Sequence, residues 1–170
     1  MEMISQECVK ESIAFASKLN DKEFTKSVHK YNDIQKNLVE CFNGFSKIYK
    51  SNNEHKRFSS FFVMHIILRC FYKSYQNIPF VNKSTIEKVK LEFRNMKHTG
   101  ENINNKIDPD EVIDFILKSE QPILMGSIIK LLASNNVKIN SLTDKDDMLL
   151  IGGIMIFVRA FNEEIKSSLN

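Results

Sequence analysis

Two basic residues one helical turn apart, His65 and Arg69, have the most evident capacity for chemistry in this sequence. They lie within FFVMHIILRCFY, residues 61–72, where almost every other residue is apolar. A charge without a partner is costly in such surroundings. We therefore interpret His65 and Arg69 as a buried, hydrogen-bonded pair that takes a carboxylate from another segment, and not as a ligand site. We interpret Cys70, which follows Arg69, as a small residue of the hydrophobic core.

The motifs of common catalytic and nucleotide-binding sites do not occur in the chain. It contains no GxSxG, GxxxxGK[ST], GxGxxG or HExxH string. The histidines at positions 29, 55, 65 and 98 are not spaced as metal ligands, either with one another or with a cysteine. We therefore predict that the protein is not an enzyme and that it holds no metal and no cofactor.

The three cysteines, Cys8, Cys41 and Cys70, are far apart in the sequence and form no CxxC pair. An odd number of scattered cysteines is typical of proteins from a reducing compartment. The first residues, MEMISQECVKES, include acids and lack the apolar run of a secretory signal. We expect a cytoplasmic protein.

The segment at 100–111, GENINNKIDPDE, carries Ile107 at a central apolar position and Glu111 at its end, followed by apolar residues. In these features it resembles the second half of an EF-hand calcium loop. It departs from that family at two positions. Gly100 replaces the aspartate that is the first ligand of an EF-hand loop, and Asn105 replaces the glycine of its turn. The resemblance implies a degenerate EF-hand-like regulatory protein, which is our third functional hypothesis.

A second resemblance involves residues 152–164, GGIMIFVRAFNEE, which are similar to part of the BH1 helix of Bcl-2 proteins. The preceding residues, TDKDDM, lack the Asn-Trp-Gly-Arg element of that motif, and few residues follow. We therefore assign the chain to no family.

The elements that must position these residues are helices, because apolar residues recur every three to four positions and no segment alternates as a strand does. We predict an all-α, single-domain bundle of about seven helices over residues 1–170, with possible lobes at 1–80 and 84–170. Two central apolar helices are expected at about 57–75 and 145–166. The other predicted helices cover approximately residues 5–19, 21–49, 84–97, 109–118 and 122–132.

The predicted helix at 21–49 has a long apolar stripe. Apolar residues follow one another at steps of three and four from Phe24 to Tyr49, and only Gln35 interrupts them. An unbroken helix over this stretch would be about 39 Å long at 1.5 Å per residue. We expect one continuous helix here.

The most apolar stretch is MLLIGGIMIFVRAF, residues 148–161, which includes Arg159 and has acidic residues on both sides. It is shorter than the ~20 residues that a membrane span needs, so we expect no membrane association. We interpret it as a core helix whose remaining face contacts a second copy of the chain. Our main hypothesis is therefore a protein–protein interaction and oligomerisation module that binds itself, as a dimer or larger species, and an unidentified protein. The interface candidates are Leu149, Gly152, Gly153, Ile156 and Phe157.

Charge supports a different function. The chain has 24 Lys and Arg against 21 Asp and Glu, a net charge of +3 that permits weak attraction to phosphate. On the helix at 84–97, basic residues gather on one side, and such a stripe can follow a phosphate backbone. Lysine-rich helices also carry such faces merely as solvated surface. Nucleic-acid binding, to RNA or DNA, through Lys83, Lys90, Arg94 and Lys97 is our alternative hypothesis.

Overall fold

The computed structural model describes residues 2–48, 54–75, 77–98, 116–134 and 145–169. Within these residues the chain is all-α, with no strand, which confirms the predicted fold class. A short helical segment at 116–118 precedes α7. The main helices are α1 (Gln6–Ala16), α2 (Asp21–Ile34), α3 (Lys36–Ile48), α4 (Glu54–Ser74), α5 (Lys83–His98), α7 (Pro122–Ser134) and α8 (Lys145–Leu169).

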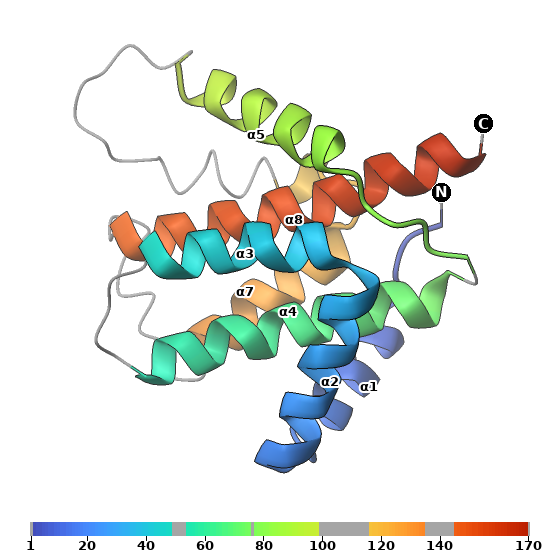
Figure 1. Cartoon of the computed structure of the whole chain (residues 1–170), viewed down its shortest axis with the longest axis vertical. Helices are drawn as coiled ribbons and strands as arrows, with labels where there is room; N and C mark the ends of the chain where they lie inside the picture. Colours follow the sequence, from blue (N-terminus) through green and yellow to red (C-terminus); the bar gives the residue numbers. More distant parts are fainter. Residues whose placement is uncertain (1, 49–53, 76, 99–115, 135–144, 170) are drawn as a thin grey trace.

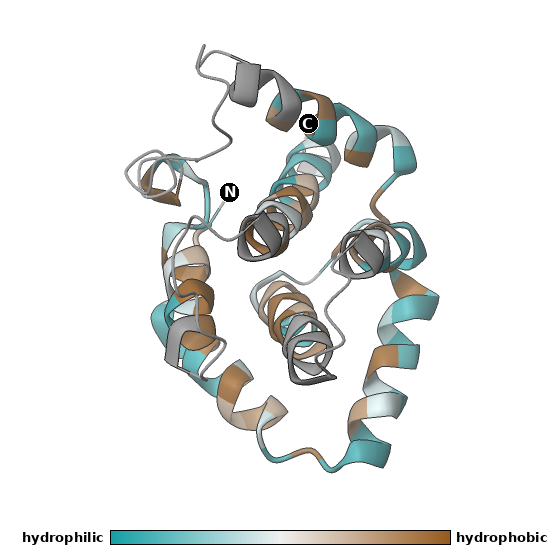
Figure 2. Cartoon of the chain, turned by 90° about the vertical axis from the view of Figure 1, so that its left-hand side faces the viewer, coloured by the Kyte–Doolittle hydropathy of each residue, from teal (hydrophilic) through white to brown (hydrophobic). Residues whose placement is uncertain are grey.

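Two helices occupy the middle of the molecule. Helix α4 packs against α1, α2, α7 and α8, while α8 also packs against α3 and α5 (Figure 1). The buried residues of α4 and α8 are nearly all apolar, while hydrophilic residues are frequent on the surrounding helices α2 and α5 (Figure 2). A helix that is apolar on most sides must be surrounded by other helices to leave water. The prediction of two central apolar helices, at about 57–75 and 145–166, is confirmed.

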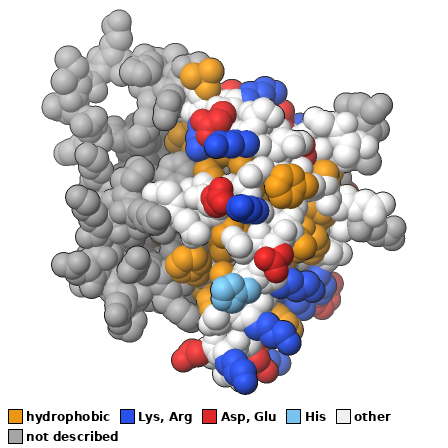
Figure 3. Space-filling model, in the orientation of Figure 1, with side chains coloured by type: hydrophobic (Ala, Val, Ile, Leu, Met, Phe, Trp, Pro, Cys, Tyr) orange, Lys and Arg blue, Asp and Glu red, His pale blue; other side chains and the backbone are white. Residues whose placement is uncertain are grey.

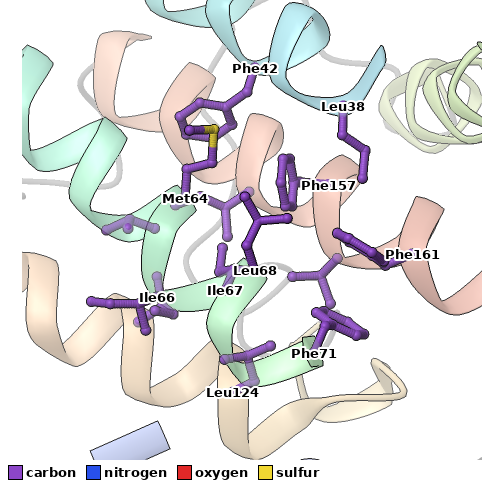
Figure 4. Packing of buried hydrophobic residues seen from close by; sticks show 14 of the residues in the cluster. Leu38, Phe42, Met64, Ile66, Ile67, Leu68, Phe71, Leu124, Phe157 and Phe161 are labelled. Carbon is purple, nitrogen blue, oxygen red and sulfur yellow. The ribbon is translucent and has the colours of Figure 1, made fainter. Parts of the chain in front are cut away.

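Aromatic side chains join the two central helices. Phe71 of α4 stacks on Phe161 of α8, with ring centroids 4.5 Å apart and an interplanar angle of 13° (Figure 4). Phe157 of α8 meets the edge of Phe42 of α3 at 5.7 Å. One hydrophobic cluster has members on all seven of these helices, so residues before and after position 82 contribute to the same core.

A buried polar side chain separates α2 from α3. Gln35 has φ −140° and ψ 46°, outside the helical region, and its side chain is buried with 1 % exposure. Its Oε1 accepts a hydrogen bond from the Val81 backbone N–H at 3.1 Å, and its Nε2 donates to the Pro79 carbonyl at 3.0 Å. These bonds hold the turn against the segment after α4. Our expectation of one continuous helix at 21–49 was therefore wrong, and the polar interruption of the stripe marks the break.

Helix α5 contacts α8 near its start and again at Phe93. Near its start, the buried carboxylate of Glu164 accepts hydrogen bonds from Asn82 and, at 2.5 Å, from Thr85. Farther along, the ring of Phe93 lies against Gly152, where an added Cβ would be 3.3 Å from the ring. A glycine in α8 thus permits the close approach of a side chain from α5.

Gly126 is an exposed glycine within α7. We expect Gly126→Ala to raise the free energy of unfolding by about 0.5–1 kcal/mol, because alanine has the higher helix propensity and its Cβ would meet nothing within 4 Å. Urea unfolding measures the change. In Gly152→Ala the helix propensity rises in the same way, but the new Cβ would lie 3.3 Å from the Phe93 ring. We therefore expect a smaller increase, or a decrease, in the free energy of unfolding. Equal stabilisation by both substitutions would contradict this packing.

Candidate interaction site

His65 lies where α1, α2 and α4 meet, and its side chain is completely buried, with 0 % exposure. Its Nε2 is 2.6 Å from the hydroxyl oxygen of Ser27 on α2. Three aromatic rings surround the imidazole: Phe15 parallel to it at 6.3 Å, Phe24 tilted at 5.6 Å and Tyr31 edge-on at 5.3 Å. The partner that we expected to be a carboxylate is thus a hydroxyl.

The protonation state of His65 follows from this burial. Loss of hydration, with a smaller effect of the Arg69 charge, lowers the pKa of His65 from 6.5 to about 4. The imidazole is therefore neutral at neutral pH. A serine hydroxyl at a histidine nitrogen is also the first contact of a nucleophile–base pair. Here, however, the ring is inaccessible, and its Nδ1 has no orienting partner within the described part of the chain.

Arg69, one turn after His65, has an unusual environment for a partly buried guanidinium. Its Cζ lies 3.6 Å from the centroid of the Phe15 ring, a cation–π contact. Among the described residues, it forms no ion pair with a carboxylate, and its buried Nε has no hydrogen-bond partner. The acid on the facing helix, Glu11, is instead paired with Lys73. The positive charge of Arg69 is thus held in place by an aromatic ring and not by a carboxylate.

Two aromatic side chains of this region are exposed. Phe15 is 39 % exposed, and Tyr72, which lies three residues after Arg69 on the same side of α4, is 36 % exposed. The Tyr72 hydroxyl accepts a hydrogen bond from Gln35 at 3.1 Å, which leaves its own hydrogen available for donation. We call Phe15, Tyr31, His65, Arg69 and Tyr72 the Arg69 cluster.

The cysteines contribute no exposed nucleophile to this region. Cys70 is completely buried in the hydrophobic core, as expected, and burial raises the pKa of its thiol to about 12. The Sγ of Cys8 lies 3.4 Å from the Ser74 hydroxyl oxygen. All three cysteines of the chain are free. A thiol with a pKa this high is a poor nucleophile at neutral pH.

Four of the five interface candidates on α8 lie in the chain's own core. Gly152, Gly153, Ile156 and Phe157 are all buried, with Ile156 and Phe157 only 4 % and 2 % exposed. The side chain of the fifth candidate, Leu149, lies outside the described residues. Helices α3, α4 and α5 of the same chain pack against α8. An interface between two copies through these four residues would require α8 to leave this core.

The charge within the apolar stretch of α8 is neutralised inside the chain. Arg159 is half-buried and forms ion pairs with Glu120 at 2.7 Å and Glu163 at 3.2 Å. Glu92 of α5 lies 4.0 Å away. These contacts tie α8 to α5 and to the segment before α7. In the described part of the chain, no helix has both the length and the apolar composition that a membrane crossing requires.

The basic residues of α5 are less available for binding phosphate than the sequence spacing predicted. Lys83 is exposed, but Lys90 is only 25 % exposed and bonds Glu87 at 2.7 Å. The side chains of Arg94 and Lys97 lie outside the described residues. On the face of the molecule in Figure 3, lysine and arginine are interspersed with aspartate and glutamate.

The loop at 100–111 that resembles an EF-hand lies outside the described residues. Among the residues that are described, no three His, Cys, Asp or Glu side chains are grouped as metal ligands. The chain matches no family model, and no curated protein or solved structure is similar to it. The Arg69 cluster must therefore be interpreted from its own geometry.

Sequence reasoning identified His65 and Arg69 but missed the residues around them. On α2, the residues Ser27 and Tyr31 lie on the same side as Phe24. Helical spacing could therefore have predicted that they face His65. Phe15 had no such signal, because it stands off the apolar face that Val9, Ile13 and Ala16 define in the sequence.

Proposed function

We propose that this chain is a non-enzymatic α-helical protein–protein interaction module. The Arg69 cluster is the observation that carries the proposal. Its guanidinium contacts the ring of Phe15, which is itself exposed, and the exposed Tyr72 lies one turn farther along the same side of α4. Arginine, tyrosine and phenylalanine are enriched at protein interfaces, and arginine and tyrosine are prominent among the residues that dominate binding energy.

The placement of reactive side chains also favours binding over catalysis. The two reactive side chains beside Arg69 on α4, His65 and Cys70, are both completely buried. The surface instead carries large apolar side chains that are at least 36 % exposed, and two of them belong to the Arg69 cluster. These residues are Met3, Phe15, Tyr72, Phe80, Leu91, Leu117 and Ile123.

The partner in this proposal is another protein, and the proposal also includes self-association. Because the candidates on α8 that can be placed are buried, a dimer would need another surface. The three free thiols suit a reducing compartment, so the proposal places the protein in the cytoplasm. Nucleic-acid binding through α5 is less favoured, because the ammonium group of Lys90 forms an ion pair with Glu87 and is less available to a phosphate.

A selection experiment tests the proposal without a known partner. We expect the immobilised full chain to enrich a defined sequence motif from a random peptide display library, and synthetic peptides with that motif to bind in solution. Isothermal titration calorimetry measures the binding, and native mass spectrometry of the 19.8 kDa chain measures self-association. A chain that enriches no motif and stays monomeric at all concentrations would contradict the proposal.

A further inference from the structure

We propose that the Arg69 cluster binds a carboxylate side chain, Asp or Glu, of a protein partner, with an apolar residue next to that acid in the partner's sequence. This inference rests on the proposed function, and it specifies the binding surface and the chemistry of the partner. It can fail while the proposed function stands, because a module of this kind could bind a partner elsewhere.

The orientation of the guanidinium is the first argument. The Cζ of Arg69 lies 3.6 Å from the centroid of the Phe15 ring, over the ring, so the central atom of the guanidinium contacts an aromatic surface. The N–H groups of a guanidinium point along the edges of its plane. Because the Nε of Arg69 is buried, the two Nη groups are the donors from which a carboxylate can accept two parallel hydrogen bonds. The contact with Phe15 therefore holds the side chain in place without using the donors that recognise a carboxylate.

The positive charge of Arg69 has no ion-pair partner among the described residues. Glu11 is bonded to Lys73, which is the main cause of its lowered pKa, and the charge of Arg69 adds only a smaller effect. Next to it, His65 is neutral and contributes no charge. For comparison, the other arginine with a described side chain, Arg159, is surrounded by three glutamates. A carboxylate from outside the chain would supply what Arg69 lacks.

The surroundings of Arg69 specify more than an anion. The exposed rings of Phe15 and Tyr72 offer apolar contact to the residue that accompanies the acid. The Tyr72 hydroxyl, which accepts from Gln35, can donate its hydrogen to a second acceptor. Recognition of an acid together with an apolar side chain is the pattern that these groups favour.

A protein partner fits these groups better than a nucleic acid does. Phosphate backbones are bound by several cations in a row, which produces a strong dependence on salt. Here one guanidinium lies among aromatic rings, and the nearby ammonium group of Lys73 is already paired with Glu11. The site therefore has the composition of a single binding hot spot and not of a phosphate track.

The test uses the full chain and a peptide selected on it from the random library. We expect the selected peptides to share an Asp or Glu beside an aromatic or aliphatic residue. Changing that acid to its amide should weaken binding to the wild-type chain at least about tenfold, as should Arg69→Gln in the chain. Combining both changes should weaken binding by little more than either alone, since the two groups act on each other. Calorimetry measures all four affinities.

Matched controls separate the charge of Arg69 from general effects. Lys130→Gln removes an exposed charge on α7 and should leave affinity unchanged. Phe15→Leu keeps an apolar side chain but removes the stacking ring, and should weaken binding several-fold. Circular dichroism and thermal melting verify that the variants are folded. The acid-to-amide change in the peptide needs no variant of the chain, so the test holds even if Arg69→Gln fails to fold.

Each outcome has a definite meaning. Selected peptides without an acid, or an acid-to-amide change that leaves affinity unaltered, would overturn this inference and leave the proposed function intact. A chain that selects no peptides would overturn this inference, and if it also stays monomeric at all concentrations it would overturn the proposed function as well. Binding of a single-stranded oligonucleotide that is lost in Arg69→Gln, together with peptides indifferent to that change, would overturn the inference in favour of phosphate recognition.

Discussion

Replacing Phe161 by alanine is expected to lower the free energy of unfolding by about 4 kcal/mol. Phe161 is completely buried, and its ring stacks on Phe71 of α4 at 4.5 Å and lies 5.7 Å from Phe157 (Figure 4). The substitution removes the aromatic contact between the two central helices and leaves a cavity that the surrounding helices can only partly fill. The loss should be among the largest that one substitution produces in this chain.

Phe80→Ala is the matched control for this prediction. Phe80 is 46 % exposed, so its truncation removes little buried area and should lower the free energy of unfolding by less than about 1 kcal/mol. Urea unfolding of both variants gives the two values, provided that the slope of the transition is unchanged. Similar losses in the two variants would contradict the central position of Phe161.

Acidification from pH 6.5 to pH 4 is expected to remove about 3 kcal/mol of stability through His65 alone. In the folded chain, burial and the Arg69 charge lower the pKa of His65 to about 4, against 6.5 for the free side chain. Between these values the unfolded chain binds the proton more tightly than the folded chain, so stability falls as pH falls. The contribution is fully present above pH 6.5 and is lost as pH decreases toward 4. One unit of pKa corresponds to about 1.4 kcal/mol.

The measurement is a series of urea titrations at pH values from 7 to 4. In His65→Phe this pH dependence should be absent, so the stability difference between wild type and variant should change by about 3 kcal/mol across the series. Carboxylates that titrate in the same range are common to both proteins and cancel in that difference. Replacing the exposed His29 by glutamine is the control and should leave the wild-type profile intact. If the free energy of unfolding changed with pH in the same way for wild type and His65→Phe, the buried, neutral state of His65 would be contradicted.

The apolar segments show how much of the fold could be predicted from the sequence. Both central helices were expected, because residues 61–72 and 148–161 are apolar on nearly every side and must be enclosed. The break at Gln35 was not expected. Its cause is a set of hydrogen bonds to backbone groups at positions 79 and 81, which are more than forty residues away.

The candidate site was predictable only in part. The spacing of His65 and Arg69 places both on one side of α4, and a buried histidine with a hydrogen-bond partner was expected. The sequence did not predict that Ser27 is the partner of His65 or that Phe15 is the partner of Arg69, because these two residues come from other helices. Helical periodicity indicates which side of a helix is apolar, but not which helix covers that side.

The sequence by itself determined that this chain is all-α and that two of its helices lie at the centre, since both properties depend on local periodicity and on the apolar composition of single segments. Only the tertiary structure decided that the apolar face of α8 is covered by α3, α4 and α5 of the same chain. It likewise placed Arg69 on the Phe15 ring without a carboxylate partner among the described residues. The physical reason is that burial and pairing depend on side chains that meet only when distant segments pack together, and the strength of those contacts is not encoded in any one segment.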